Sequence, residues 1–238
     1  MGRNVLITGA SRGIGAAIAT EYAAGGYDLI LNTSKSSADL NTLAFKLITQ
    51  YGINCINSIG DIGDPDYVRK LFSSVEHLDV LINNAGVSHI GLIQDMTDAD
   101  WRRVIDTNLS GVFYTCREAS GLMLKEHAGS IINISSIWGD QGASMEVAYS
   151  ASKGGVNTFT RALAKELAPS GISVNAISCG VINTSMNSCF SEEEMKQIIE
   201  EIPKGRLGTP EEVAKVAFYL GNAPEYLTGQ IIGVDGAY

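Results

Sequence analysis

Residues 4–15, Asn-Val-Leu-Ile-Thr-Gly-Ala-Ser-Arg-Gly-Ile-Gly, are the part of this sequence that decides its fold. The apolar run at residues 4–8 predicts a short buried strand, and residues 16–24 favour a helix. Between them, three glycines allow a tight turn and bring a helix N-terminus close to a pyrophosphate. The stretch therefore predicts a dinucleotide-binding strand–loop–helix unit. The glycines are Gly9, Gly13 and Gly15.

Strand-like and helical segments alternate along the rest of the 238-residue chain. We expect further strands at 28–31, 53–59, 78–82, 130–135, 172–177 and 228–236, and helices at 36–51, from Asp64-Pro65, at 98–125, at 149–167 and from Pro210. This alternation predicts an α/β fold of the Rossmann type: a doubly wound parallel sheet of about seven strands with helices on both faces. No linker or repeat divides the chain, so we expect a single domain. Its cofactor-binding half covers about 1–125 and its catalytic and substrate half about 126–238.

Composition excludes several classes of function. A formal net charge of −9 disfavours nucleic acid and anionic membranes as partners, and no apolar run is long enough to span a membrane. The four cysteines have no metal-like spacing, and no signal peptide precedes the first strand, so a cytoplasmic location is expected. The three histidines lie far apart, which predicts no metal site.

Tyr149 and Lys153 are the candidate catalytic pair. Four residues apart on a helix, they share one face, where the ammonium lowers the pKa of the phenol towards the working range. Ser136 follows the apolar run 130–135, at the strand end where an open α/β sheet builds its sites, and can hold a carbonyl oxygen. A chance surface pair is the alternative for Tyr149 and Lys153.

The end of the second strand indicates the cofactor. No carboxylate stands between Leu29 and Ala38, whereas an NAD site usually places one there for the ribose 2′-hydroxyl. Asn32, Ser34 and Lys35 are present instead, and Arg12 of the glycine loop can approach the same place. Two cations and a hydroxyl suit a 2′-phosphate, so NADP(H) is predicted. The alternative is that both cations are solvated.

Three later segments add cofactor contacts and a lid. Asp61 and Ile62 follow the third strand, where they cap an adenine ring or precede a helix N-terminus. Asn84-Ala85-Gly86 follows the fourth strand and is expected to lie against a ribose. Asn108 is a poor helix former inside a predicted helix, which suggests a kink that holds water. Residues 184–204 are expected to form a mobile lid.

Over essentially its full length the chain resembles the short-chain dehydrogenase/reductase family. The resemblance rests on Thr8-Gly9-x3-Gly13-x-Gly15, Asp61, Asn83-Asn84-Ala85-Gly86, Asn108, Ser136, Tyr149-x3-Lys153 and Asn175. Within the family it is most similar to the 3-oxoacyl-[acyl-carrier-protein] reductases, through Ile202-Pro-Lys-Gly-Arg-Leu-Gly208 and Thr228-Gly-Gln-Ile. The resemblance implies NADPH-dependent reduction of a 3-oxoacyl thioester in fatty acid synthesis, and a homotetramer. The alternative is another ketone or secondary alcohol, such as acetoacetyl-CoA.

The resemblance also implies roles for single residues. Tyr149 donates the proton, Ser136 binds the carbonyl oxygen, Lys153 holds the nicotinamide ribose and Asn108 keeps a water behind Lys153. Cofactor contacts are implied for Gly9, Ser11, Arg12, Gly13, Ile14, Gly15, Asn32, Ser34, Lys35, Asp61, Ile62, Asn84, Ala85, Gly86, Tyr149, Lys153, Ile182 and Thr184. Ser136, Trp138, Glu146 and Met186 are the expected substrate contacts. Cys179 replaces the usual proline and Glu146 a common glutamine; the first is expected to be a tolerated small residue.

Overall fold

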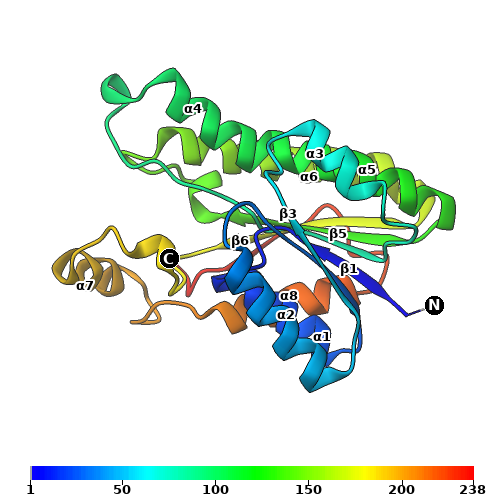
Figure 1. Ribbon diagram of the computed structural model, residues 1–238. Helices are drawn as coiled ribbons and strands as arrows, with labels where there is room; N and C mark the ends of the chain where they lie inside the picture. The colour runs from blue at the N-terminus through cyan, green and yellow to red at the C-terminus, as the bar shows by residue number, and fades with distance from the viewer. Residues whose placement is uncertain (1) are drawn as a thin grey trace.

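A computed structural model describes residues 2–238, which form one seven-stranded parallel sheet in the order β3-β2-β1-β4-β5-β6-β7 (Figure 1). The chain steps outward from β1 in one direction, then returns and continues from β4 in the other. This is the doubly wound arrangement, and it confirms the predicted fold class. The strands are β1 (Asn4–Ile7), β2 (Asp28–Thr33), β3 (Cys55–Ile59), β4 (Val80–Asn83), β5 (Gly129–Ser136), β6 (Ile172–Cys179) and β7 (Ile231–Val234).

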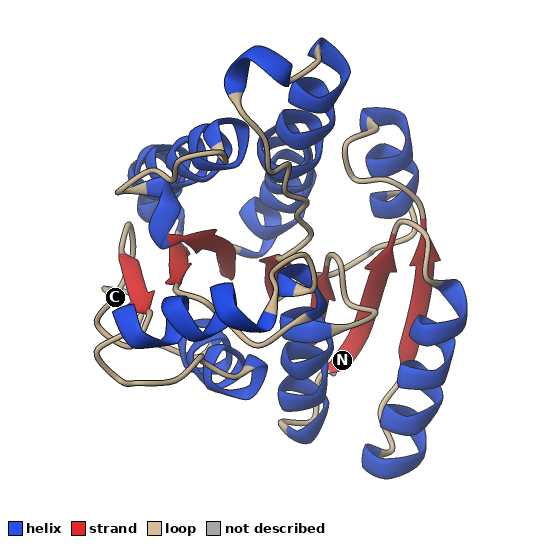
Figure 2. Cartoon of the chain, turned by 90° about the vertical axis from the view of Figure 1, so that its left-hand side faces the viewer, coloured by secondary structure: helices blue, strands red, loops and turns tan. Residues whose placement is uncertain are grey.

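Helices cover both faces of the sheet, as Figures 1 and 2 show. Alternate residues of β1 build the two cores: Val5 and Ile7 pack on one face, and Leu6 packs on the other. On the first face lie α1 (Gly13–Ala24), α2 (Ser37–Tyr51) and α8 (Pro210–Gly221). On the second lie α3 (Pro65–Phe72), α4 (Asp98–Ile105), α5 (Gly111–Glu126) and α6 (Val147–Leu167).

The helix expected at 98–125 is interrupted. Between α4 and α5 the residues Asp106–Ser110 form a five-residue π-helical turn, and Asn108 lies buried within it. An extra residue in a helical turn re-aims the side chains that follow it, and such turns occur mostly at functional sites. The predicted helix is therefore interrupted at Asn108, and the water expected there stays a prediction.

Other boundaries differ from the sequence-based expectations by a few residues. The third strand begins at Cys55, and α6 begins at Val147, two residues before Tyr149. The last strand is the short β7, although the Gly229 amide donates to the Val174 carbonyl ahead of it. Strand and helix ends depend on tertiary contacts that local sequence does not encode.

The segment predicted as a lid carries α7 (Glu192–Glu201), which lies to one side of the sheet (Figure 1). A capping box between Ser191 and Glu194 begins α7, and none of its residues is buried. Ile202, directly after it, is 3% exposed and anchors the end of the segment. Within residues 2–238, no helix combines the length and apolar character that crossing a membrane requires.

Candidate active site

The predicted site residues gather at the carboxyl ends of β1, β4, β5 and β6. In a doubly wound sheet the strand order reverses here, and the loops from neighbouring strands leave a crevice between them. The glycine loop follows β1, Asn84 follows β4, Ser136 ends β5, and Thr184 lies beyond the end of β6.

Thr8 and Asn84 lock the glycine loop to the loop after β4. The buried Thr8 hydroxyl accepts the backbone N–H groups of Asn84 and Ala85, each at 3.0 Å. The Asn84 side chain donates to the Thr8 and Gly9 carbonyls, also at 3.0 Å. Gly9 has φ +65°, and a Cβ there would lie 2.8 Å from the Ala85 Cα. Only glycine fits that position.

The residues around α1 fit a dinucleotide. Helix α1 begins without a capping side chain, as α2, α5 and α6 do, and carries no acidic residue in its first turn. Its first N–H groups are thus free to bind an anion, and the helix dipole favours negative charge there. A Cβ on Gly13 would lie 3.3 Å from Thr184 Cγ2, so Thr184 lies against the glycine loop.

Arg12 in the glycine loop, and Ser34 and Lys35 after β2, are exposed. Neither Arg12 nor Lys35 forms an ion pair with any residue from 2 to 238. Asn32, a predicted cofactor contact, is 1% exposed, and its side-chain amide donates to the Gly60 carbonyl at 3.0 Å and to Tyr67 at 2.9 Å. Its side chain braces β2 against the chain after β3.

Asp61 and Ile62 take different positions. Asp61 is exposed and accepts the Gly63 amide at 2.9 Å, while Asp64, not Asp61, caps α3. Ile62 is 3% exposed and packs so closely on α5 that a Cβ on Gly111 would lie 2.5 Å from its Cδ1. The Ile62 side chain therefore belongs to the core, and its contact with an adenine ring stays a prediction.

Lys153 lies one helical turn after Tyr149 and is buried, with 4% exposure. Its Nζ donates to the Ile134 carbonyl at 2.7 Å and lies 5.6 Å from the centre of the Tyr149 ring. Burial lowers the pKa of Lys153 to about 8. The predicted juxtaposition of phenol and ammonium is present.

The pKa of Tyr149 moves in the direction opposite to that expected. Burial raises it most, nearby Cys179 and Glu146 also raise it, and Ser136 acts against them. Desolvation is the largest of these influences, and it opposes the hydrogen bond to Ser136. Tyr149 keeps its proton at neutral pH, which is the form required of a proton donor.

Ser136 and Cys179 are paired neighbours at the ends of β5 and β6. Ser136 is 6% exposed, and its hydroxyl accepts the Trp138 amide at 3.2 Å. The Cys179 thiol is buried, and this burial raises its pKa to about 12. A neutral thiol beside Ser136 acts as a small apolar group and not as a nucleophile.

Asn108 connects the loop after β4 to α6. Its Oδ1 accepts the Val87 amide at 2.8 Å, and its Nδ2 donates to the Val87 carbonyl at 2.8 Å and to Ser152 at 3.1 Å. The Ser152 hydroxyl donates to the Tyr149 carbonyl at 2.7 Å. A Cβ on Gly86 would lie 3.5 Å from Asn108 Oδ1 and 3.6 Å from Lys153 Nζ. Asn108 thus lies behind the catalytic pair, held by three hydrogen bonds.

The other three predicted substrate residues differ in their contacts and exposure. Glu146 precedes α6 and accepts the Ser88 hydroxyl at 2.6 Å, Trp138 packs on Tyr238, and Met186 is 47% exposed. Ser88 and Tyr238 did not emerge from the sequence, because neither stands in a motif and both contacts join distant segments.

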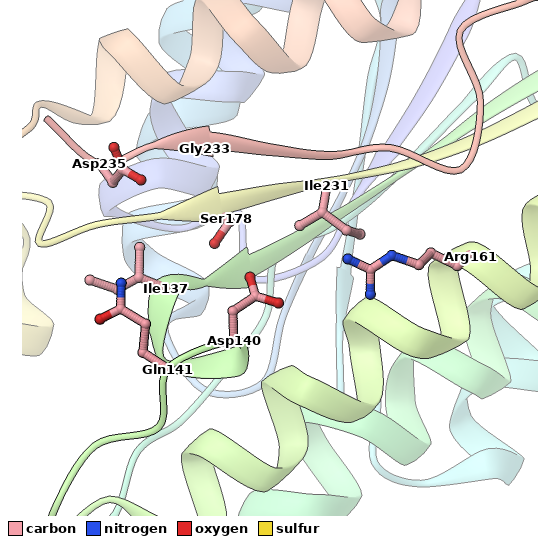
Figure 3. A pocket seen from close by; sticks show the side chains of 8 residues that line it. All are labelled: Ile137, Asp140, Gln141, Arg161, Ser178, Ile231, Gly233 and Asp235. Carbon is pink, nitrogen blue, oxygen red and sulfur yellow. The ribbon is translucent and has the colours of Figure 1, made fainter. Parts of the chain in front are cut away.

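A cavity of about 280 Å³ lies beside the end of β5, but none of the predicted site residues lines it (Figure 3). It is lined by Ile137, Asp140, Gln141, Arg161, Ser178, Ile231, Gly233 and Asp235. The side chains mix both charges, and Asp140 already accepts the Asn157 amide at 3.1 Å. No three metal-ligating side chains gather anywhere in residues 2–238.

Comparison with known proteins gives consistent results. Residues 3–195 match the family described as short chain dehydrogenase. An uncharacterized oxidoreductase of Bacillus subtilis, YmfI, is 40% identical and aligns over 100% of this chain and 99% of its own. The 3-oxoacyl-[acyl-carrier-protein] reductase FabG of Aquifex aeolicus is 37% identical over 99% of this chain and 96% of its own. The solved structure of YwfH, described as an NADPH-dependent reductase involved in bacilysin biosynthesis, covers 100% of this chain and 98% of its own, with a TM-score of 0.94 and 26% identity.

Proposed function

Because the chain belongs to the short-chain dehydrogenase family, it is an oxidoreductase that uses a nicotinamide cofactor, and we propose that it reduces 3-oxoacyl thioesters with NADPH. The observation that carries the proposal is the convergence of Asn108, Ser136, Tyr149 and Lys153 beside an uncapped, glycine-lined helix N-terminus. Full-length similarity to carrier-protein reductases such as FabG of Aquifex aeolicus supports the substrate class.

In this mechanism the bound nicotinamide supplies the hydride, and the protein supplies orientation and a proton. Ser136 donates a hydrogen bond to the substrate carbonyl oxygen and stabilises the negative charge that develops there. Tyr149, which is protonated at neutral pH, gives its proton to the same oxygen. The ammonium of Lys153 then stabilises the phenolate, and binds the nicotinamide ribose.

Asn108 holds this arrangement in place and, in the proposal, keeps a water behind Lys153 through which Tyr149 regains its proton. Its three hydrogen bonds fix the backbone of Val87 and the start of α6 relative to each other. Thr184 and the Ile182 backbone bind the carboxamide; Asn187 secures Ile182 by donating to its carbonyl at 2.8 Å. Fixed orientation lowers the entropic part of the barrier.

The preference for NADPH rests on charge. Arg12 and Lys35 are exposed and unpaired among residues 2–238, next to the Thr33 and Ser11 hydroxyls at the end of β2. A 2′-phosphate gains charge-assisted hydrogen bonds from such cations, whereas a 2′-hydroxyl gains little. YwfH, which aligns with this chain throughout, is described as NADPH-dependent.

A second candidate is reduction of another ketone, and Glu146 favours it. Its carboxylate, hydrogen-bonded to Ser88, accepts hydrogen bonds but donates none, so it cannot bind a thioester carbonyl as an amide side chain does. YwfH, moreover, is described as acting in bacilysin biosynthesis, a different pathway. The contacts made by Asn108, Ser136, Tyr149 and Lys153 are compatible with either substrate.

We also propose a homotetramer, formed through the 98–125 and 149–167 helices and the last strand. Large apolar side chains stay exposed on the first of these helical regions: Trp101 at 42%, Phe113 at 44% and Leu124 at 40%. A subunit contact through these helices would cover these side chains. Sedimentation equilibrium tests the assembly.

The substrate proposal is tested by NADPH oxidation with an acetoacetyl group carried on acyl-carrier protein, on coenzyme A, or offered as a free ketone, with NADH in parallel. We expect the highest kcat/KM with the carrier-protein thioester and NADPH. Turnover of free ketones alone would replace the thioester by the second candidate.

A further inference from the structure

Tyr238 joins two parts of the molecule that are far apart in the sequence. Its ring meets the Trp138 ring edge-on, with centroids 5.8 Å apart and planes at 72°. Its hydroxyl donates to Glu201 Oε2 at 2.7 Å. Trp138 gives its backbone N–H to the hydroxyl of Ser136, and Glu201 is the last residue of α7. Tyr238 therefore connects Trp138, which lies beside Ser136, to the end of α7.

A strained turn holds Tyr238 in this position. Gly236 and Ala237 have φ values of +72° and +69°, a conformation that costs free energy for alanine. The turn is held by the Ala237 amide, which donates to Asp235 Oδ1 at 2.9 Å, and by the Lys204 amide, which donates to the Gly236 carbonyl at 3.2 Å. Such backbone persists only where its surroundings secure it.

The same turn secures the end of α7. A Cβ on Gly236 would lie 3.0 Å from Ile202 Cγ2, so the buried Ile202 packs directly on the turn. None of the α7 residues is buried, so its C-terminal end depends on Ile202 and on the bond from Tyr238 to Glu201. Figure 1 places α7 next to the end of the chain.

The protonation state of Tyr238 favours its hydrogen bond to Glu201. Burial, with the bond to Glu201 after it, raises the pKa of Tyr238 to about 12. The hydroxyl therefore remains a donor throughout the pH range in which a reductase is assayed, and its acceptor is a carboxylate. Hydrogen bonds to a charged partner are stronger than neutral ones.

We propose that Tyr238 is a positioning residue that fixes α7 against Trp138 and so closes the substrate site beside Ser136. The catalytic half of this inference rests on the proposed function, because it assumes that the carbonyl binds at Ser136. The mechanical half, that Tyr238 holds α7, does not. Loss of the hydroxyl frees the end of α7, and the substrate then binds in a looser site.

Tyr238→Phe removes the hydroxyl and leaves the ring on Trp138. Tyr226→Phe is the matched control, because it makes the same chemical change at a fully exposed tyrosine. Two measurements apply: the rate at which trypsin cleaves α7 after Lys196 in the native protein, and KM and kcat for the carbonyl substrate. Glu201→Ala breaks the same bond from its other end.

We expect Tyr238→Phe to raise both the cleavage rate and KM about fivefold, as for loss of one hydrogen bond to a partly solvated carboxylate, with kcat within twofold. Tyr226→Phe should match the unmodified protein. The Tyr238→Phe/Glu201→Ala double variant should behave like either single variant, because both remove one interaction.

A cleavage rate and KM unchanged in Tyr238→Phe would overturn the inference, as would additive effects in the double variant. A protein that reduces no carbonyl would instead defeat the proposed function. In that case the trypsin comparison still decides whether Tyr238 holds α7, because it needs no substrate.

Discussion

Replacing Asn108 by leucine tests whether this buried side chain holds the catalytic cluster together. Leucine has the same number and branching of side-chain heavy atoms, but it leaves the Val87 N–H, the Val87 carbonyl and the Ser152 hydroxyl without the partners they have in the structure. Asn108 is 0% exposed, so water does not replace them freely. An unsatisfied buried polar group costs about 1–3 kcal/mol.

Ser152 keeps its hydrogen bond to the Tyr149 carbonyl and can relax after the substitution. The total cost is therefore smaller than that of three unsatisfied groups added together. We therefore expect a loss of about 3 kcal/mol in the free energy of unfolding, and a fall in Tm of about 6–12 °C for a domain of this size. Urea unfolding followed by circular dichroism measures the first, and calorimetry the second.

The matched control is Asn41→Leu, since Asn41 is exposed and its single partner is the side chain of Asn57. That change should stay within about 0.5 kcal/mol. If Asn108→Leu were as stable as Asn41→Leu, the hydrogen bonds assigned to Asn108 would contribute nothing, and its role as a brace would be wrong.

Three further predictions concern the cofactor loop, the cofactor phosphate and Lys153. Gly9→Ala should abolish NADPH binding in a fluorescence titration, because alanine at φ +65° would also meet Ala85 at 2.8 Å; unchanged affinity would contradict the locked loop. Arg12→Ala with Lys35→Ala should raise the KM for NADPH roughly tenfold or more and leave that for NADH within twofold, since each cation offers a charge-assisted bond only to the phosphate. Burial lowers the pKa of Lys153 from 10.5 to about 8, so between these values the unfolded chain binds more protons at this residue than the folded one. Its contribution to stability should rise with pH across that interval, so the change in urea midpoint from pH 8 to pH 10 should be less positive in Lys153→Met than in the unmodified protein; the same signed change in both proteins would refute the shift.

Local features of the sequence predicted the fold class and most of the candidate catalytic residues. The glycine loop, the four-residue spacing of Tyr149 and Lys153, and the position of Ser136 at a strand end all follow from short-range geometry. The alternation of strands and helices then requires a parallel sheet, whose carboxyl ends bring these residues together.

Features that depend on the tertiary environment could not be predicted in the same way. Asn32 turns into the protein to meet Gly60 and Tyr67, and Ile62 packs on α5, because of neighbours distant in sequence. The raised pKa of Tyr149 reflects desolvation by distant parts of the chain, whereas spacing alone suggested the influence of Lys153. Tyr238 carried no motif at all.

The most direct test of the account is the kcat/KM of Tyr149→Phe for NADPH-dependent reduction of an acetoacetyl thioester. Phenylalanine retains the ring but removes the proton that Tyr149 is proposed to donate. We predict a loss of about 10²–10⁴-fold, with NADPH affinity within threefold as proof of an intact cofactor site. A variant that keeps more than a third of the original kcat/KM would contradict the assignment of Tyr149 as the proton donor.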